Sequence, residues 1–233
     1  MQVKTVNATA ADKSSAQVLF DSLFGLRELY WPGKQTIRVL DAFARNGQLT
    51  VSQCVNRPGV TVSAWELGPE HEQALWDLGC AEVAIGCSYE QVQRSTSVTD
   101  KYDLIVIDTP QGLHKSYDGK VRSEHWDFMG QALSLVHQSA VFVLYVNTDP
   151  YDARILGEHG YDTYSEYDYD QWMVARRRFY GQARPHIDQA LTIYRKVAWS
   201  WGWEFNQPLV VPCLSDVPGK APYAYRVAFK VSI

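Results

Sequence analysis

The sequence has no long apolar run, few cysteines and little net charge. No apolar run approaches the ~18 residues that span a bilayer, and residues 1–15 lack the apolar core of a signal peptide. We therefore expect a soluble, cytoplasmic protein that does not bind membranes. The 4 cysteines show no C-x-x-C pair and no zinc-ligand spacing, which predicts free thiols and no metal site.

The composition is that of an ordinary globular protein, with 46% hydrophobic and 21% charged residues among 233. The formal net charge of -4 excludes a protein that coats nucleic acid through bulk positive charge, although it allows a local basic groove. No internal repeat is present, which excludes a solenoid.

Short apolar runs alternate with helix-like segments from residue 36 onward. The runs that predict strands are 36–43, 60–67, 81–87, 102–108 and 140–147. The segments between them that predict helices are 48–57, 68–79 and 125–138. The near-continuous apolar runs are typical of parallel strands buried on both faces. This pattern predicts an α/β fold, a Rossmann-like doubly wound sheet that is mostly parallel.

The two ends of the chain and one internal segment depart from this alternation. Residues 1–35 predict an N-terminal helical extension, and 36–233 a single domain. Residues 149–170 are rich in Asp, Glu and Tyr and predict a long insertion that could serve as a lid, a recognition loop or an interface with a protein partner. After a helix at 185–201, two runs separated by turn residues predict a C-terminal antiparallel pair, which makes seven strands in all.

Acidic residues end three of the predicted strands. Ligands of doubly wound sheets bind beyond the carboxyl ends of the strands, where the strand order reverses. Asp41, Glu66 and Asp108 occupy such ends. Glu66 follows Asp41 at a spacing close to that of carboxylates that bind a ribose diol. The alternative interpretation is that Glu66 caps the next helix.

The turn after the first strand lacks the G-x-G-x-x-G sequence of dinucleotide sites. That absence disfavours a pyrophosphate on a helix N-terminus, and with it a nicotinamide-dependent oxidoreductase. Asn46 and Gly47 form a tight-turn dipeptide in which both residues tolerate positive φ. A single sharp turn of this kind favours a ligand without phosphates. Arg45 could point to solvent or pair with a ligand carboxylate.

These segments resemble the motifs of class I S-adenosylmethionine-dependent methyltransferases, over roughly residues 36 to 233. VLDAFARNGQLT (39–50) resembles the first motif in its D-x-F-x-G-x-G form, with Arg45 in place of the first glycine. AWEL (64–67) resembles the second motif, and GCSYE (86–90) resembles the third. The resemblance implies S-adenosylmethionine as the cofactor, with Glu66 on its ribose. The cofactor contacts that it implies are Asp41, Phe43, Gly47, Glu66 and Ser88.

DLIVIDTPQG (103–112) resembles the fourth motif, D/N-P-P-Y/F, of nucleic-acid amino-methyltransferases. The resemblance implies catalytic roles for Asp108 and Pro110, with the Asp108 carboxylate accepting a hydrogen from the target amine. In the family an aromatic residue stacks on the substrate base. Gln111 stands at that position here, and Tyr117 could replace the aromatic ring. Gln111 and Tyr117 are therefore candidate substrate contacts.

A third candidate substrate contact is Arg177, which lies in a basic cluster formed by Arg176, Arg177, Arg178 and Arg184. The cluster could contact phosphates of a nucleic acid, or it could be a solvated helix face.

Two functions follow from the motifs and their departures. The first is a methyltransferase that N-methylates a nucleic-acid base or a similar amine. The second is a catalytically inactive methyltransferase-like domain that acts as a structural or binding component of a larger assembly, such as a virus particle. Arg45, Cys87 and Gln111, at positions where the family has other residues, favour the second.

Overall fold

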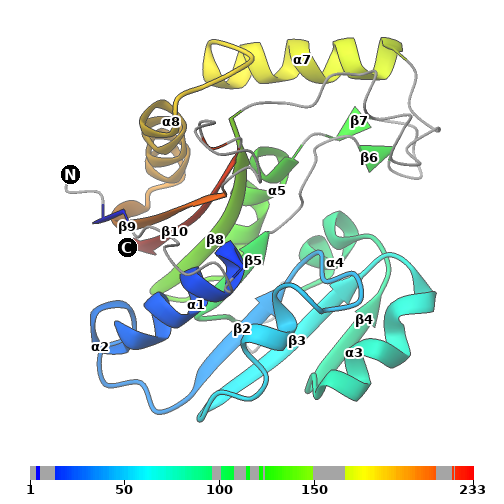
Figure 1. The fold of residues 1–233 in the computed structure, drawn as a ribbon, viewed down its shortest axis with the longest axis vertical. Helices are drawn as coiled ribbons and strands as arrows, with labels where there is room; N and C mark the ends of the chain where they lie inside the picture. The colour runs from blue at the N-terminus through cyan, green and yellow to red at the C-terminus, as the bar shows by residue number, and fades with distance from the viewer. Residues whose placement is uncertain are drawn as a thin grey trace.

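The computed structural model describes residues 4–5, 14–95, 101–107, 114–115, 121–122, 124–148, 166–213, 222 and 224–233. In these residues one sheet of 8 strands has the order β1-β9-β10-β8-β5-β2-β3-β4, and helices lie on both of its faces (Figure 1). Its strands are β1 (Lys4–Thr5), β2 (Ile37–Asp41), β3 (Val60–Glu66), β4 (Glu82–Ile85), β5 (Leu104–Ile107), β8 (Ser139–Asn147), β9 (Glu204–Cys213) and β10 (Ala224–Ser232).

The helices fall between the strands along most of the chain. The α-helices are α1 (Ser15–Gly25), α2 (Arg27–Tyr30), α3 (Glu72–Leu78), α4 (Ser88–Arg94), α5 (Glu124–Ala132), α7 (Glu166–Tyr180) and α8 (Ile187–Ser200). The 3-10 helices are η1 (Val51–Gln53), η2 (Pro69–His71) and η3 (Leu133–Leu135). A separate antiparallel pair joins β6 (His114–Lys115) to β7 (Val121–Arg122).

Strands β8, β5, β2, β3 and β4 pair in parallel, and β10 pairs antiparallel with both β8 and β9. This arrangement confirms the predicted α/β fold, a Rossmann-like and mostly parallel sheet with a C-terminal antiparallel pair. The described sheet also has a short strand that the sequence did not predict. This strand, β1, pairs in parallel with β9, so the segment 1–35 contributes a strand as well as helices.

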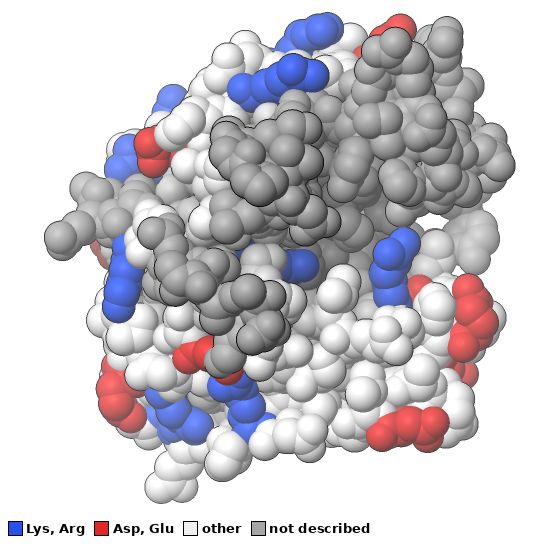
Figure 2. All heavy atoms as spheres, in the orientation of Figure 1, with Lys and Arg blue, Asp and Glu red and all other residues white. Residues whose placement is uncertain are grey.

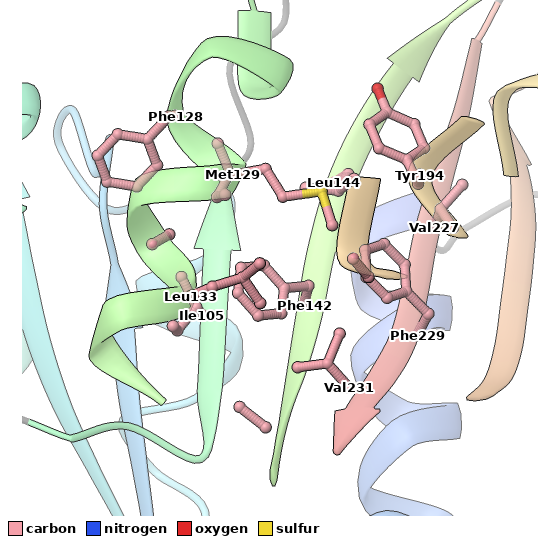
Figure 3. Packing of buried hydrophobic residues seen from close by; sticks show 14 of the residues in the cluster. Ile105, Phe128, Met129, Leu133, Phe142, Leu144, Tyr194, Val227, Phe229 and Val231 are labelled. Atoms are coloured by element: carbon pink, nitrogen blue, oxygen red, sulfur yellow. The ribbon is translucent and has the colours of Figure 1, made fainter. Parts of the chain in front are cut away.

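The run AVFVLYVN in β8 is continuously apolar because both faces of the sheet are covered. Phe142 and Leu144 belong to a core that includes residues of α4, α5 and α8, and Figure 3 shows several of these side chains together. Val141 and Val143 belong to a second core that includes residues of α1, η1 and α3. Alternate residues of a strand point to opposite faces, so a strand between two cores needs apolar residues at every position.

Helix α1 is held at its start by the Ser14 side chain, which accepts a hydrogen bond from the Gln17 N–H at 3.2 Å. Its buried residues Leu19, Phe20 and Leu23 belong to the second core. The helix therefore covers one face of the sheet.

One predicted segment differs from the structure. The helix expected at 48–57 is wrong, because the described chain has only the 3-10 turn η1 there. The Thr50 hydroxyl donates to Asp41, which ties the start of this segment to the end of β2 and leaves no room for a regular helix. Most of the insertion predicted at about 149–170 lies outside the described residues, and α7 begins within it at Glu166. The predicted helix at 185–201 is α8.

None of the described helices is both long enough and apolar enough to cross a membrane. On the face that Figure 2 shows, basic and acidic side chains are interspersed over the described part of the surface, and acidic ones gather at the lower right.

Candidate ligand-binding edge of the sheet

The strand order reverses between β2 and β5. From β2 the chain adds β3 and β4 on one side, and it then crosses to add β5 and β8 on the other. In such sheets the crevice at the carboxyl ends of the two diverging strands is the usual ligand site. The carboxyl ends of β2 and β3, which are Asp41 and Glu66, lie at this edge, and Ser88 begins the helix after β4.

Asp41 shapes the loop that follows its own strand. Its side chain is 1% exposed. The carboxylate accepts hydrogen bonds from the Thr50 hydroxyl and, at 3.3 Å, from the Phe43 N–H. The two bonds hold both ends of the loop 42–50 against β2. Thr50 was not among the predicted residues, because no spacing rule identifies a threonine nine residues after a strand.

Glu66 joins two loops at the edge. Its Oε2 accepts from the Arg45 N–H at 2.5 Å, and its Oε1 accepts from the Gly68 N–H at 3.0 Å. A carboxylate offers about four acceptor positions, so each oxygen can accept a further hydrogen bond. The Gly68 contact is a local bond to the residue before η2 and caps no helix, because neither η2 nor α3 has a side-chain cap. The Arg45 contact links β3 to the loop after β2.

Arg45 holds a backbone conformation that glycine usually holds. Its φ is 51°, in the left-handed region that costs most residues roughly 1–2 kcal/mol. This is the position where the resembling motif has glycine. Arg45 therefore adopts a φ that glycine favours, and its side chain is exposed.

Gly47 is required by both conformation and space. Its φ is 72°, and a Cβ atom there would lie 2.6 Å from Leu78 Cδ1, 2.9 Å from Leu75 Cδ2 and 3.0 Å from Val51 Cβ. The Gly47 N–H also donates to the Ala44 carbonyl at 2.8 Å. The turn therefore lies directly against α3.

Ser88 and Phe43 lie on the other side of the loop. The Ser88 hydroxyl donates to the Ala42 carbonyl at 2.5 Å, which ties the start of α4 to the end of β2. The half-buried Phe43 ring packs edge-on against Phe128 at 5.1 Å and against Tyr89 at 6.2 Å between centroids. The five predicted cofactor residues thus occupy one stretch of the edge, although Asp41 and Ser88 use their polar groups to fix the loop.

Two thiols near Asp41 are held neutral. Burial, and then the negative charge of Asp41, raise the pKa of Cys54 far above its usual value. The same two causes raise the pKa of Cys80 to about 11. Because the thiolate is the reactive form, these raised pKa values disfavour a nucleophilic role for either cysteine near neutral pH.

Of the remaining predicted residues, the structure describes only Arg177. Asp108, Pro110, Gln111 and Tyr117 lie outside the described residues. Arg177 is exposed on α7, which Figure 1 shows across the top of the molecule, far from β3 and β4. The described residues contain no group of three or more His, Cys, Asp or Glu side chains that could bind a metal ion.

Arg176 fits neither interpretation of the basic cluster, whereas Arg177, Arg178 and Arg184 are exposed. Arg176 is 0% exposed, so it neither contacts solvent nor offers its charge to a nucleic acid. Its Nε donates to the Ala183 carbonyl at 2.8 Å and one terminal nitrogen donates to the Asn147 carbonyl at 2.5 Å. The guanidinium also lies over the rings of Trp172 and Tyr180. Arg176 therefore fixes α7 to the end of β8.

The sequence matches no family model and no curated protein, but the fold matches solved methyltransferases. The plantazolicin methyltransferase BamL, in complex with triazolic desmethylPZN analog and SAH, is 12% identical with a TM-score of 0.55, over 94% of this chain and 84% of that one. BpumL, in complex with the same analog and SAH, is 12% identical with a TM-score of 0.56, over 95% and 86%. The CurJ carbon methyltransferase is 16% identical with a TM-score of 0.57, over 94% and 54%. At these identities the likeness shows the fold.

Proposed function

We propose that this chain is an S-adenosylmethionine-dependent methyltransferase that methylates a nitrogen on a nucleic-acid base or a similar amine. The observation that carries the proposal is the junction of the loop 42–50 with Glu66, at the point where the strand order reverses. A tight turn and a ribose-binding carboxylate meet there, in a fold shared with methyltransferases whose structures contain SAH, the product form of the cofactor.

The residues at the edge fit this cofactor. Glu66 keeps two acceptor positions after binding the two backbone N–H groups, which suits the two hydroxyls of a ribose. Gly47 provides the positive φ of the tight turn, and the backbone of this loop is the proposed contact with the methionine part of the ligand. Phe43 and Ser88 are the proposed neighbours of the adenine. The Arg45 departure, which favoured an inactive domain, is accommodated because Arg45 holds a glycine-like φ.

The cofactor supplies an activated methyl group: the acceptor nitrogen uses its lone pair to form the N–C bond, the S–C electron pair stays on sulfur, and the amine gives up one proton. The protein has to hold the acceptor nitrogen in line with that methyl group, and such positioning provides much of the catalysis. We assign this role to Asp108 and Pro110, with Gln111, Tyr117 and Arg177 as contacts to the rest of the substrate. Residues 149–170 are the proposed contact with a protein partner.

The nitrogen acceptor rests on the sequence D-T-P-Q at 108–111, which resembles the fourth motif of amino-methyltransferases. The solved structures with this fold support the cofactor class but do not favour one acceptor. BamL and BpumL are plantazolicin methyltransferases, and CurJ is a carbon methyltransferase.

The test is thermal unfolding of the purified protein with and without SAH, together with calorimetric titration. Ligand at a hundredfold excess over its dissociation constant adds about 2.7 kcal/mol to the free energy of unfolding. At ~2–4 °C per kcal/mol for a chain of this size, the midpoint should rise by roughly 5–10 °C. Absence of both a shift and a heat of binding at millimolar SAH would exclude the proposed function.

A matched pair of variants locates the binding. Glu66→Gln replaces one of the two acceptor oxygens by a donor, so the variant should lose most of the SAH-induced shift. Glu70→Gln changes an exposed carboxylate four residues away and should retain the shift in full. An equal loss in both variants would mean that the cofactor does not bind at Glu66.

A further inference from the structure

Strand β8 ends in an unusual buried amide. Asn147 is 2% exposed, and both its Nδ2 and its Oδ1 lack a hydrogen-bond partner. Burying a polar group without a partner is costly, and native proteins rarely leave both atoms of one amide in this state. A buried amide that makes no hydrogen bond within the protein is a candidate for hydrogen bonding to a ligand.

The register of the strands places Asn147 at the same edge as the proposed cofactor site. Alternation along β8 puts its side chain on the face of Val143 and Tyr145. Ala224 lies opposite Asn147, and Cys213 lies opposite Ala224. The register neighbours of Asn147 on the β10 side therefore have small side chains.

Asn147 lies on the β5 side of the crevice. Asp41 aligns with Val106, which aligns with Val143, and Asn147 is four residues further along β8. Two strand spacings and four residues correspond to roughly 10 Å across and 13 Å along the strands. The proposed cofactor residues follow β2, β3 and β4. Asn147 therefore lies on the opposite side of the crevice, where the methyl acceptor would bind.

The backbone of Asn147 is fixed while its amide is unpartnered. Arg176 donates to the Asn147 carbonyl at 2.5 Å and is itself held by the Ala183 carbonyl. An amide whose backbone is already fixed loses little conformational freedom when it binds a ligand.

We propose that Asn147 is the specificity-determining residue for the methyl acceptor, and that it recognises an amine beside a ring nitrogen, as on adenine or cytosine. Its Oδ1 would accept an N–H of the amine and its Nδ2 would donate to the ring nitrogen, the bidentate pairing that suits an asparagine and an adenine edge. This inference rests on the proposed function, because it takes the ligand on the β5 side to be the acceptor.

The test uses adenosine and cytidine monophosphates as probes, titrated by calorimetry with and without SAH. N6,N6-dimethyladenosine monophosphate, which has no N–H on its amine, is the comparison ligand. The wild type should prefer adenosine monophosphate over the dimethyl form by about 5- to 150-fold, the range of one good bidentate pair. Asn147→Leu, of nearly the same shape, should lose this preference while the SAH-induced shift is retained.

Stability without ligand separates recognition from a structural role. Asn147→Leu removes two unpartnered polar groups, so its thermal midpoint should equal or exceed that of the wild type. A lower midpoint would mean that the amide has partners in the folded protein, and would overturn the inference. Gln207→Ala is the control, because Gln207 Oε1 is also buried without a partner but lies at an irregular part of β9 away from this edge. It should leave the preference unchanged.

The two proposals fail in different ways. A wild type that binds SAH but shows no preference between the two adenine nucleotides would overturn the role of Asn147 and leave the methyltransferase proposal in place. A wild type that does not bind SAH would exclude the proposed function. In that case, titration of adenosine monophosphate without SAH tests whether Asn147 recognises the amine edge. Equal binding to the wild type and to Asn147→Leu would overturn this recognition.

Discussion

Replacement of Gly47 by alanine tests how the loop after β2 is packed. The substitution adds one methyl group at a φ of 72°, within 3.0 Å of three side-chain atoms. Leu75 is fully buried and cannot rotate away, whereas Leu78 is only half-buried. Alanine in the left-handed region costs roughly 1–2 kcal/mol. Alanine also lowers the conformational entropy of the unfolded chain, which offsets about 0.4–1 kcal/mol of this cost. Overpacking adds about 1–3 kcal/mol.

Gly33 is the matched control. Its φ of 68° is nearly the same, but a Cβ atom there would meet nothing within 4 Å. Gly33→Ala should therefore lower the free energy of unfolding by about 1 kcal/mol, through backbone conformation alone. Gly47→Ala should lower it by about 2–4 kcal/mol, because crowding adds to the conformational cost. At ~2–4 °C per kcal/mol, the midpoint falls by roughly 2–4 °C in the first variant and 4–16 °C in the second.

The assay is equilibrium unfolding in urea, with thermal unfolding as a second measurement. If crowding causes the difference, Gly47→Ala should cost less in a Leu78→Ala background than in the wild type, because the nearest atom has been removed while those of Leu75 and Val51 remain. Equal destabilisation by the two single substitutions would refute the reasoning, since it would mean that the turn does not lie against α3.

Three further predictions concern other features of the fold. Arg45→Gly should leave the free energy of unfolding unchanged or raise it by up to about 1 kcal/mol, because glycine adopts the φ of 51° without strain; a clear loss in urea unfolding would show that the arginine side chain stabilises the fold. Arg176→Met should destabilise by roughly 2–4 kcal/mol, because it removes the donor from the buried bond to Asn147 and from the part-buried bond to Ala183. The exposed neighbour Arg177→Met should stay within about 0.5 kcal/mol, and similar values for the two would refute the buried role of Arg176. The pKa of about 11 for Cys80 means that the folded thiol keeps its proton after the unfolded chain has lost it. The free energy of unfolding should therefore fall as the pH rises from about 9 to 11. Between pH 8 and pH 10 the thermal midpoint should fall further in the wild type than in Cys80→Ala, and equal falls would contradict the raised pKa.

Periodicity and turn residues were enough to predict the sheet apart from its short edge strand β1. The runs at 36–43, 60–67, 102–108 and 140–147 became β2, β3, β5 and β8 within a few residues, because strands buried on both faces need apolar residues at every position. The strand-end rule also identified Asp41 and Glu66. Applied to the fifth run as well, it would have pointed to Asn147, the single polar residue that closes AVFVLYVN.

The sequence by itself determined which residues end the strands, since that depends on local patterns of polarity. Only the tertiary structure decided what those residues contact. The hydrogen bonds of Asp41 to Thr50, of Glu66 to the Arg45 N–H and of Arg176 to the end of β8 join segments whose separation along the chain follows no period. Whether a charged side chain is exposed like Arg177 or buried like Arg176 depends on the element that packs against it, and adjacent residues of the same type can therefore have opposite environments.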